Sequence, residues 1–540
     1  MAKLQTEILR VNLSQGEIKR EIINQAITEK FVGGRGLGVY LLYKELKPKT
    51  DPMSPENKLI FMTGPLTGTL FPASCRTHVI TKSPLTGGLG DSNFGGFWGP
   101  ELKFAGIDGI IFEEVAEEPV YLWVHDEEVE LKDASKYWGK GTWETVVGIR
   151  KEVNDTKARV TCIGPAGENK CLIASIFGDE NRAAGRTGTG AVMGSKNLKA
   201  IVVRGKKKVH VAEPEKAKEL VKEIREKIKN SKATGVTLPK YGTAALVNVA
   251  NAHGAFPSYN FKTGKFASAD KISGETLAST LLIKTKTCWG CPISCGRVTR
   301  VTEVPYQSFG EGPQYETIWA LGPQCGISDL NAIVKVHHFC NELGMDALSF
   351  GSAMGCAMEL YEKKKIPEEK LNGLQLEWGN PQALLELVWK CAYRIGFGDD
   401  ISHGAKRLAD KYGAPELAMH VKGLELPAYD PRAVLGMGLA YATANRGGDH
   451  LRANIGILEM VGFPEKLDPL TTKGKAKWVK MLQDWFAIVD SLIVCKFVGT
   501  RALKADDLPP LINAITGWNW TLEDLLKTGE RIYNLERMFI

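Results

Sequence analysis

Three cysteines stand close together in the middle of the chain, in the stretch Cys288-Trp-Gly-Cys291-Pro-Ile-Ser-Cys295. Glycine and proline between them interrupt any regular helix or strand, so we expect a tight loop whose sulfurs converge. Converging thiolates suit an iron–sulfur cubane, which takes four cysteine ligands. The fourth is expected at Cys495, at the end of a long apolar run. A structural zinc loop and a set of unligated thiols are the alternatives, and we favour a [4Fe–4S] site.

Two glycine-rich segments in the first part of the chain combine arginine with small residues. Arg76 and the pattern of a strand precede the run GDSNFGG, and Arg182 and Arg186 belong to the run RAAGRTGTG. Arginine forks and backbone N–H groups without bulky neighbours both bind phosphate. The pair of segments therefore predicts a phosphorylated ligand, with plain glycine-rich turns as the alternative. A third run, at 32–38, misses the G-x-G-x-x-G spacing of a dinucleotide site.

The composition is that of a globular chain of 540 residues, long enough for about three domains. Basic residues (69) exceed acidic ones (62) only slightly, which does not indicate a nucleic-acid-binding surface. No apolar run reaches the ~18 residues that span a bilayer, and the N-terminus lacks the apolar core of a signal peptide. We therefore expect a cytoplasmic chain without nucleic-acid or membrane partners.

Eleven cysteines in such a chain indicate thiols and metal rather than disulfides. Those outside the proposed cluster site stand singly among apolar residues, so we expect them to be small core residues. They are Cys75, Cys162, Cys171, Cys325, Cys340, Cys356 and Cys391.

The elements that position these residues change in type along the chain. A hairpin (6–13 with 18–23) and a strand (199–203) fall in a strand-rich first part, and a helix after the glycines is expected at 39–46. Later segments with a 3.6-residue period predict helices at 215–232, 329–343, 381–395, 402–412 and 521–540. The fold class is therefore α/β (α+β) and multidomain: a strand-rich domain (1–208) followed by two mainly helical domains (209–424 and 425–540).

His337 and His338 lie within one of these helical patterns. Neighbouring positions on a helix point about 100° apart, which makes adjacent histidines a poor metal clamp. We expect them on the helix surface or at an interface.

The cysteine loop, the two anion segments and their order resemble the tungsten-containing aldehyde ferredoxin oxidoreductase family over essentially the whole chain. The runs that carry the resemblance are GGRGLG (33–38), TKSPLTG (81–87), GDSN (90–93), the cysteine loop, YET (315–317) and NRGGDH (445–450). Together they are specific, although any one alone would not be.

The resemblance implies a tungsten or molybdenum held by two pterins, without a bond from the metal to the protein. The residues that match the family's cofactor-binding segments are Arg76, Asn93, Phe94, Gly95, Arg182, Ala183, Gly185, Arg186, Asp346, Arg446, Arg452 and Asp490. It also implies a Mg²⁺ bridging the pterin phosphates, with the backbone carbonyls of Asn93 and Ala183 as protein ligands.

Three departures from the family pattern stand out. The motif that starts at Asp490 has Ile493 where the family has glycine, and the corresponding motif at 341–346 begins with Asn341. Lys335 falls near the glutamate of the family's intersubunit metal site, so a homodimer is expected without that bridging metal. Relatives continue for several dozen residues beyond Ile540.

The resemblance also implies the activity, with Glu316 as acid/base and His450 as donor to the substrate carbonyl. We expect oxidation of aldehydes to carboxylic acids, with electrons passing through the [4Fe–4S] cluster to ferredoxin or a small iron–sulfur subunit. The alternatives are reduction of an aromatic ring, as in benzoyl-coenzyme A reductase subunits, and an electron-transfer protein without pterin. The paired arginine-and-glycine segments disfavour the last, because a cubane alone does not need them.

Overall fold

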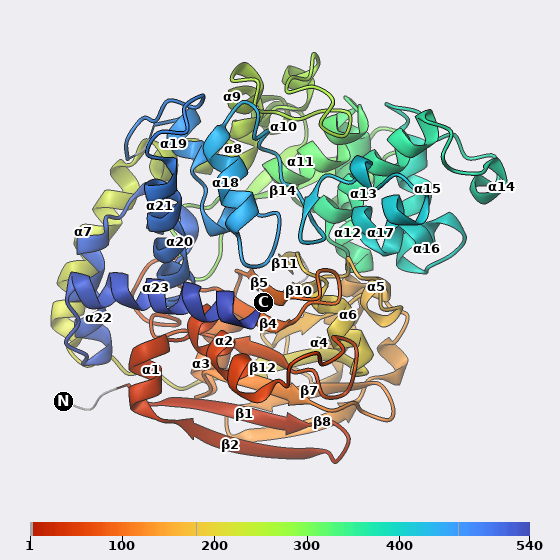
Figure 1. Ribbon diagram of the computed structural model, residues 1–540. Helices are drawn as coiled ribbons and strands as arrows, with labels where there is room; N and C mark the ends of the chain where they lie inside the picture. Colours follow the sequence, from red (N-terminus) through yellow and green to blue (C-terminus); the bar gives the residue numbers. More distant parts are fainter. Residues whose placement is uncertain (1–3, 180, 463) are drawn as a thin grey trace.

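The structure is a computed structural model that describes residues 4–179, 181–462 and 464–540. Within these residues, two six-stranded sheets lie between residues 6 and 204, and helices dominate the remainder. In Figure 1 the strand-rich part lies below the helical part, and the last helix, α23 (Leu522–Phe539), returns to the strands. The predicted fold class is confirmed.

The first sheet has the strand order β2-β1-β6-β3-β4-β5. β1 and β2 form the predicted antiparallel hairpin, and β4 and β5 pair antiparallel from Thr77↔Phe94 to Lys82↔Leu89. The first anion segment is therefore the outermost strand of this sheet. The bounds are β1 (Thr6–Asn12), β2 (Glu17–Ile23), β3 (Leu59–Met62), β4 (Thr77–Lys82), β5 (Leu89–Phe94) and β6 (Gly109–Glu113).

The second sheet has the order β11-β10-β9-β12-β7-β8. Apolar side chains of the two sheets share one buried core, to which Phe61 and Phe94 contribute from the first sheet and Val124 and Val203 from the second. The second anion segment begins on the outer strand β11. The bounds are β7 (Val120–His125), β8 (Glu128–Asp133), β9 (Arg159–Cys162), β10 (Ile176–Gly178), β11 (Arg182–Ala184) and β12 (Leu198–Arg204).

Helices α2 and α23 cover the other face of the first sheet, where Leu37, Ile80 and Ile532 belong to one core. α2 (Gly34–Glu45) begins five residues before the predicted 39–46, so the glycine run is its first turn rather than a loop. A Cβ on Gly38 would lie 2.4 Å from the Ile80 side chain. The glycines therefore allow the helix to pack directly on the sheet. The remaining helices here are α1 (Gln25–Phe31), α3 (Trp98–Phe104), α4 (Thr142–Glu152), α5 (Pro165–Glu168) and α6 (Thr189–Ser195).

The predicted helices of the later parts are confirmed to within a few residues at their ends. A three-stranded sheet, β13 (Leu282–Lys286), β14 (Gly296–Val301) and β15 (Ser308–Glu311), lies among them. The helices from 209 to 424 are α7 (Pro214–Asn230), α8 (Leu238–Tyr241), α9 (Leu246–Ala252), α10 (Gly274–Thr280), α11 (Tyr315–Leu321), α12 (Leu330–Leu343), α13 (Ala347–Glu362), α14 (Glu368–Leu371), α15 (Pro381–Ala392), α16 (Phe397–Ser402) and α17 (Gly404–Lys411). The short β16 (His420–Val421) and β17 (Leu424–Glu425) precede α18 (Leu435–Thr443), α19 (Gly456–Met460), α20 (Lys475–Ser491), α21 (Lys496–Arg501) and α22 (Leu508–Thr516).

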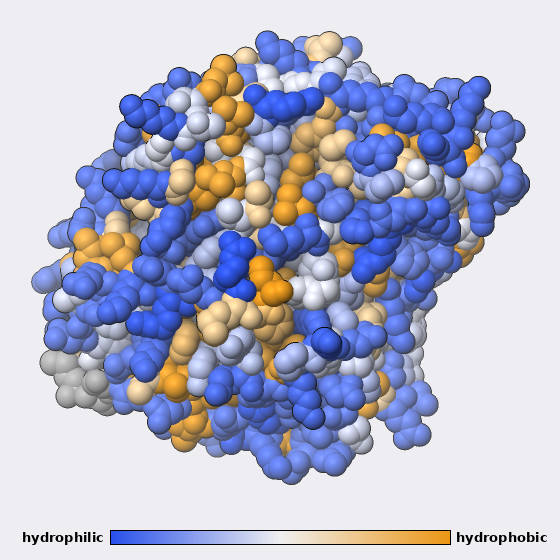
Figure 2. All heavy atoms as spheres, viewed as in Figure 1, coloured by the Kyte–Doolittle hydropathy of each residue, from blue (hydrophilic) through white to orange (hydrophobic). Residues whose placement is uncertain are grey.

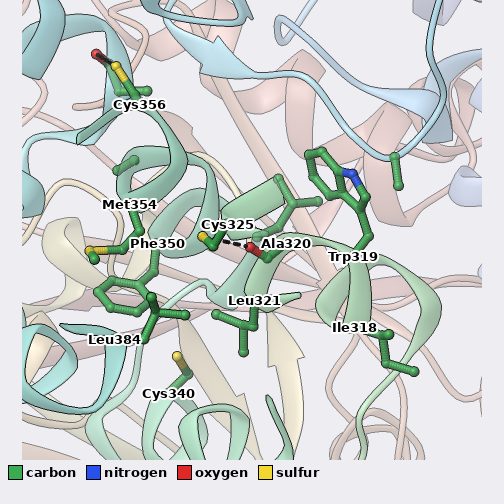
Figure 3. Packing of buried hydrophobic residues seen from close by; sticks show 14 of the residues in the cluster. Ile318, Trp319, Ala320, Leu321, Cys325, Cys340, Phe350, Met354, Cys356 and Leu384 are labelled. Carbon is green, nitrogen blue, oxygen red and sulfur yellow. Dashed lines mark hydrogen bonds between the residues drawn. The ribbon is translucent and has the colours of Figure 1, made fainter. Parts of the chain in front are cut away.

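The lone cysteines of the helical part are core residues, as predicted. Figure 3 shows Cys325, Cys340 and Cys356 among apolar side chains such as Trp319 and Phe350. Cys325 Sγ donates to the Ala320 carbonyl at 3.5 Å, and burial raises the pKa of these thiols. They are therefore held as neutral thiols.

His337 and His338 are buried on α12, so the expectation of surface histidines is wrong. Nε2 of His337 pairs with the Glu311 carbonyl at 2.9 Å, and Nε2 of His338 with the Thr299 hydroxyl at 3.2 Å. The sheet β13–β15 covers this face of the helix, which explains the burial. Burial lowers the pKa of His337 to about 4.

The outer surface in the view of Figure 2 is mostly hydrophilic, with small hydrophobic areas between the charged side chains. Within the described ranges, the helices include none with the length and apolar character of a membrane span.

Candidate active site and cysteine loop

The cysteine loop connects β13 to β14 and turns at Gly290 and Ser294, which have left-handed backbones (φ +61° and +54°). Cys495 reaches the same place from the C-terminal part, where it precedes α21. Ala73 joins the two: its N–H donates to the Gly290 carbonyl at 3.3 Å, and its carbonyl accepts from the Cys495 N–H at 3.0 Å. The structure thus brings together the four cysteines predicted from the sequence.

The thiols influence one another electrostatically. Burial, followed by the electrostatic influence of the nearby Cys495 sulfur, raises the pKa of Cys291 and of Cys295 to about 12. Bound cations would offset this repulsion, because a coordinating thiol is deprotonated by the metal. Among the residues that the structure describes, no three His, Cys, Asp or Glu side chains are arranged to hold a single metal ion.

Cys75 lies beside this group, although it was expected to be an ordinary core residue. It is buried and hydrogen bonded to Cys288, which lowers the pKa of Cys288 to about 5 together with the charges of Arg182 and Arg76. A Cβ on Gly95 would lie 3.1 Å from Cys288 Sγ and 3.9 Å from Cys75 Sγ. Gly95 therefore contributes room for sulfur at this position.

The two arginines of the anion segments also contact this region. Arg76 donates to the Asn93 side chain; burial opposes its charge, but the nearby sulfurs of Cys495, Cys75 and Cys288 raise its pKa. Arg182 pairs with Glu311 at 2.6 Å and is likewise influenced by Cys288. Both cations thus lie between the cysteines and the strands β5 and β11.

A buried network of ion pairs forms a second group of charged side chains. Its four cations are Arg35, Arg446, Arg452 and Lys496, and its four anions are Asp91, Asp449, Asp490 and Glu536. Arg35 forms a two-pronged pair with Glu536 (2.5 and 2.6 Å), and Arg452 reaches Asp91 at 2.5 Å and Asp490 at 3.2 Å. The charges of these eight side chains balance, which favours their burial together, and the buried ring of His78 also contacts Asp91, at 3.1 Å.

One short segment belongs to both regions. Asp490 and Lys496 are ion-paired members of the network, and Cys495 lies between them in the chain. The segment 490–496 therefore connects the cysteines to the ion-pair network within seven residues of backbone.

Ile493, in the same segment, takes the left-handed conformation (φ +69°) that the family's glycine would favour. A β-branched residue rarely adopts it. Its buried side chain occupies space over two glycines: a Cβ on Gly34 or Gly64 would lie 2.7 or 2.6 Å from it. The isoleucine is thus accommodated by small residues elsewhere, at the cost of backbone strain.

The remaining expected cofactor residues line the edge strands. Asn93 is the second-last residue of β5, which contacts β11, where Ala183 is exposed, so their carbonyls belong to neighbouring strands. Phe94 turns its ring into the core, 5.9 Å from the ring of Trp98, and only its backbone remains for a ligand. Gly185 lies close to Asp346: a Cβ placed on Gly185 would lie 3.7 Å from the carboxylate of Asp346.

Arg186 points from the second anion segment toward the helical parts. It donates to the carbonyls of Gly448 (3.0 Å) and Glu425 (2.8 Å), and its Nε lies 3.5 Å from the Asp346 carboxylate. The Ser349 hydroxyl lies 2.7 Å from the carboxylates of both Asp346 and Glu425. This arginine therefore ties all three parts of the chain together.

Glu316 and His450 approach each other, with 3.5 Å between Glu316 Oε1 and His450 Nε2. Glu316, in the first turn of α11, is held through Oε2 by the Ala428 N–H at 3.0 Å. Burial raises the pKa of Glu316 to about 8, against the Ala428 hydrogen bond and the charge of Arg186. Burial lowers the pKa of His450 to about 4, against Asp449. At neutral pH the two groups are therefore mainly uncharged.

Aromatic residues surround this pair. The ring of Tyr429 lies 5.4 Å from His450 and 5.7 Å from Tyr315, and the Tyr441 hydroxyl donates to the Tyr429 carbonyl at 3.0 Å. These side chains exclude water from the carboxyl of Glu316, which explains its raised pKa.

Several buried polar atoms near the pair have no hydrogen-bond partner among the described residues: Arg186 Nε, Glu316 Oε1, Asn445 Oδ1, His450 Nδ1 and Asn454 Oδ1. Leaving such atoms unpaired costs about 1–3 kcal/mol each. A polar ligand with donors and acceptors, such as a pterin, would satisfy them. A cavity of about 530 Å³ next to Asn445 and Arg446, with Lys406, Arg407 and Lys422 in its lining, adds space suited to an anionic group.

Sequence reasoning missed some members of this site. Arg35 and Asp91 lie in two of the runs that carry the resemblance, so a signal for them existed. Tyr429 lies five residues beyond the predicted domain boundary at 424/425, where no functional residue was expected. For Lys496 and Glu536 there was no signal, because their partners are distant in the sequence.

The comparisons with known proteins agree with this fold and place the chain among oxidoreductases. Residues 8–205 match the family model "Aldehyde ferredoxin oxidoreductase, N-terminal domain", and residues 219–540 match "Aldehyde ferredoxin oxidoreductase, domains 2 & 3". The chain belongs to the aldehyde ferredoxin oxidoreductase family, and the predicted resemblance is confirmed.

Similar proteins match over nearly the whole chain. The tungsten-containing aldehyde ferredoxin oxidoreductase of Pyrococcus furiosus is 50% identical over 533 residues, which cover 98% of this chain and 87% of the relative. The enzyme of the same name from Pyrococcus abyssi is 50% identical over 537 residues (99% and 88%). The solved active-site complex BamBC of benzoyl coenzyme A reductase superposes with a TM-score of 0.84 at 28% identity, covering 99% of this chain and 89% of that one.

Proposed function

We propose that the protein oxidises aldehydes to carboxylic acids at a tungsten–pterin site, and that a [4Fe–4S] cluster passes the electrons to ferredoxin. The observation that carries this proposal is the convergence of Glu316 and His450 in a dry pocket beside Arg186, within a chain half identical to tungsten-containing aldehyde ferredoxin oxidoreductases. Molybdenum in place of tungsten would leave the protein contacts unchanged, because the pterin supplies the metal's ligands.

The cofactors would be held by residues from every part of the chain. Cys288, Cys291, Cys295 and Cys495 are proposed as cluster ligands, and the carbonyls of Asn93 and Ala183 as ligands of Mg²⁺, a cation that prefers oxygen. Two sets of side chains are proposed for the pterins. Arg76, Arg182 and Arg186, with the backbone at Phe94, Gly95 and Gly185, would bind phosphate, and Asp346, Arg446, Arg452 and Asp490 would bind the polar ring atoms.

The tungsten–pterin group, when bound, supplies the acceptor for the two electrons of the aldehyde C–H bond. In our proposal Glu316, in its ionised form, removes a proton from the water that attacks the carbonyl carbon. His450 is held neutral, and its unpaired Nδ1 is available to donate to the carbonyl oxygen. One aldehyde and one water thereby give one carboxylic acid, two protons and two electrons.

Reduction of an activated aromatic ring, the second candidate, draws support from the likeness to the benzoyl coenzyme A reductase complex. The 50% identity to aldehyde oxidoreductases exceeds the 28% identity to that complex, so aldehyde oxidation is favoured. A cytoplasmic location and a homodimer complete the proposal.

The test is the anaerobically purified protein with the variants Glu316→Gln and Glu303→Gln, the second a control at an exposed carboxylate away from the proposed cofactor residues. We expect about four irons per tungsten, aldehyde-dependent reduction of benzyl viologen, and a 10²–10⁴-fold loss of turnover in Glu316→Gln with metal content unchanged. Near-normal turnover in fully metallated Glu316→Gln would remove the carboxylate from the mechanism. Iron without tungsten or molybdenum would overturn the whole assignment.

A further inference from the structure

The chain segments that surround the cysteine loop carry basic residues and no acidic ones. These segments are residues 64–76, 231–247 and 281–302, and none contains an Asp or Glu, although acidic residues make up 62 of the 540. The chain as a whole is nearly balanced in charge, so this local excess of cations is a property of the surroundings of the loop.

Several exposed side chains form the surface of these segments. We define the cluster face as Lys232, Val236, Lys240, Ile283, Lys284, Gly290 and Pro292, all of them exposed. Its two large apolar side chains, Val236 and Ile283, are 59% and 52% exposed. Gly290 and Pro292 belong to the cysteine loop itself, so the loop reaches the protein surface here.

Hydrogen bonds hold the parts of the cluster face together. The buried guanidinium of Arg297, two residues after Cys295, donates to the carbonyls of Pro239 (2.7 Å) and Lys240 (2.8 Å). The Ser294 hydroxyl bonds to the hydroxyl of Thr285, next to Lys284, at 3.0 Å. Helix α10 contacts both α8 and β13. The lysines are therefore fixed in position relative to the cysteines.

The lysines of the cluster face are free to interact with a partner. Within the described part of the chain, none of Lys232, Lys240 and Lys284 forms an ion pair, whereas Lys207 on the adjoining segment is paired with Glu127 at 3.0 Å. Glu275 of α10 acts on Lys240 only through a weak electrostatic attraction. The main partner of Lys240 is the ring of Tyr241, whose centre lies 5.0 Å from the ammonium nitrogen.

We propose that the cluster face is the docking surface for a small acidic iron–sulfur protein of the ferredoxin kind. This proposal rests on the proposed function, in which each aldehyde releases two electrons, so a one-electron acceptor docks twice in each turnover. Unpaired lysines attract and orient an acidic partner, and the apolar side chains between them exclude water once it has docked. Electrons would then leave through the part of the loop that is exposed.

The test compares two double variants of the full-length holoenzyme that change the net charge equally. Lys240→Glu/Lys284→Glu reverses the charge of two lysines on the cluster face. Lys365→Glu/Lys370→Glu reverses the charge of two exposed lysines at α14, at the far right of Figure 1. With an acidic two-cluster ferredoxin as acceptor, we expect the first variant to raise the KM for ferredoxin by about tenfold or more. Added salt should no longer weaken the binding of ferredoxin to this variant, because the attraction that salt screens is gone. The control should match the wild type, and benzyl viologen reduction should be normal in both.

A binding titration separates this proposal from the proposed function. The Kd of the same ferredoxin is measured without aldehyde, with a basic c-type cytochrome as the opposite probe. Weaker ferredoxin binding and stronger cytochrome binding by Lys240→Glu/Lys284→Glu would support the docking surface even if no aldehyde were oxidised. Equal Kd values for ferredoxin in the reversed variant and the control would overturn it, whatever the activity.

Discussion

The cysteine loop and the buried ion-pair network hold their functional side chains in opposite ways. Three of the four thiols come from one loop of eight residues that reaches the surface, and only Cys495 arrives from far away in the chain. The network takes its charges from five separate stretches, the outermost being Arg35 and Glu536, and buries all of them. Local spacing therefore suffices to recognise the first, whereas the second exists only once the chain has folded.

The largest expected effect is the loss of the cluster when its distant ligand is removed. Cys495→Ala should bleach the broad visible absorption or leave a three-iron EPR signal, because one iron loses its thiolate. Cys75→Ala is the matched control, since its thiol lies beside Cys288 but is not a proposed ligand. If the Cys75 variant lost iron and the Cys495 variant kept a four-iron spectrum, the ligand assignment would be reversed.

The next effect concerns the network. Removing one partner of a buried pair typically costs 3–5 kcal/mol, because the other charge stays buried and unpaired. Arg35→Met should therefore lower the temperature of irreversible inactivation markedly, whereas Arg35→Met/Glu536→Met should recover part of the loss. A double variant as unstable as the single would show that the pair is not the unit that matters.

The pH dependence of turnover is expected to reveal Glu316. Burial raises its pKa to about 8, so the ionised base is scarce below that pH and becomes abundant above it. Turnover limited by this base should rise about tenfold between pH 7 and pH 9. Glu316→Gln lacks the group and should show no such rise in its residual rate. A flat wild-type profile from pH 7 to 9 would mean that the proton is taken elsewhere.

The smallest effect lies at Ile493, in the segment shared by both regions. Both Ile493→Gly and Ile493→Ala remove the buried side chain, but only glycine adopts the left-handed backbone without strain, which costs other residues about 1–2 kcal/mol. The glycine variant should thus be more stable than the alanine variant by about that amount. Ala487, in the middle of α20, should show the usual reverse order of stability: the Ala487→Gly variant should be less stable than the protein with alanine there. Equal stabilities of the two Ile493 variants would indicate that the backbone there is not strained.

Much of this molecule could be predicted from its sequence, but the parts differ in how directly. The hairpin, most of the helices and the cysteine loop depend on patterns within a few residues, and the structure has them where the patterns indicate. The start of α2 was misplaced because glycines that usually end or precede helices here allow close packing on Ile80. The burial of His337 was missed because the strands that cover it lie outside its own helix.

The candidate site was predictable only through the resemblance. Glu316 and His450 are 3.5 Å apart in space but belong to different parts of the chain, and no local pattern links them. The partners Arg35 and Glu536 are separated by nearly the whole chain, so no sequence pattern near either residue predicts the contact with the other. Tyr429 lies just after the predicted domain boundary at 424/425, whereas its segment is packed against Glu316 through Ala428.

The segment 490–496 has a consequence for how the protein should fail in air. Oxidation of the Cys495 thiolate would release the backbone that also carries Asp490 and Lys496, and displacement of Asp490 would leave Arg35 and Arg452 without one of their carboxylate partners. Damage at a single sulfur would then reach the pterin pocket at once rather than leave it intact. Iron content, tungsten content and activity are therefore expected to decay along one common exponential during exposure to oxygen.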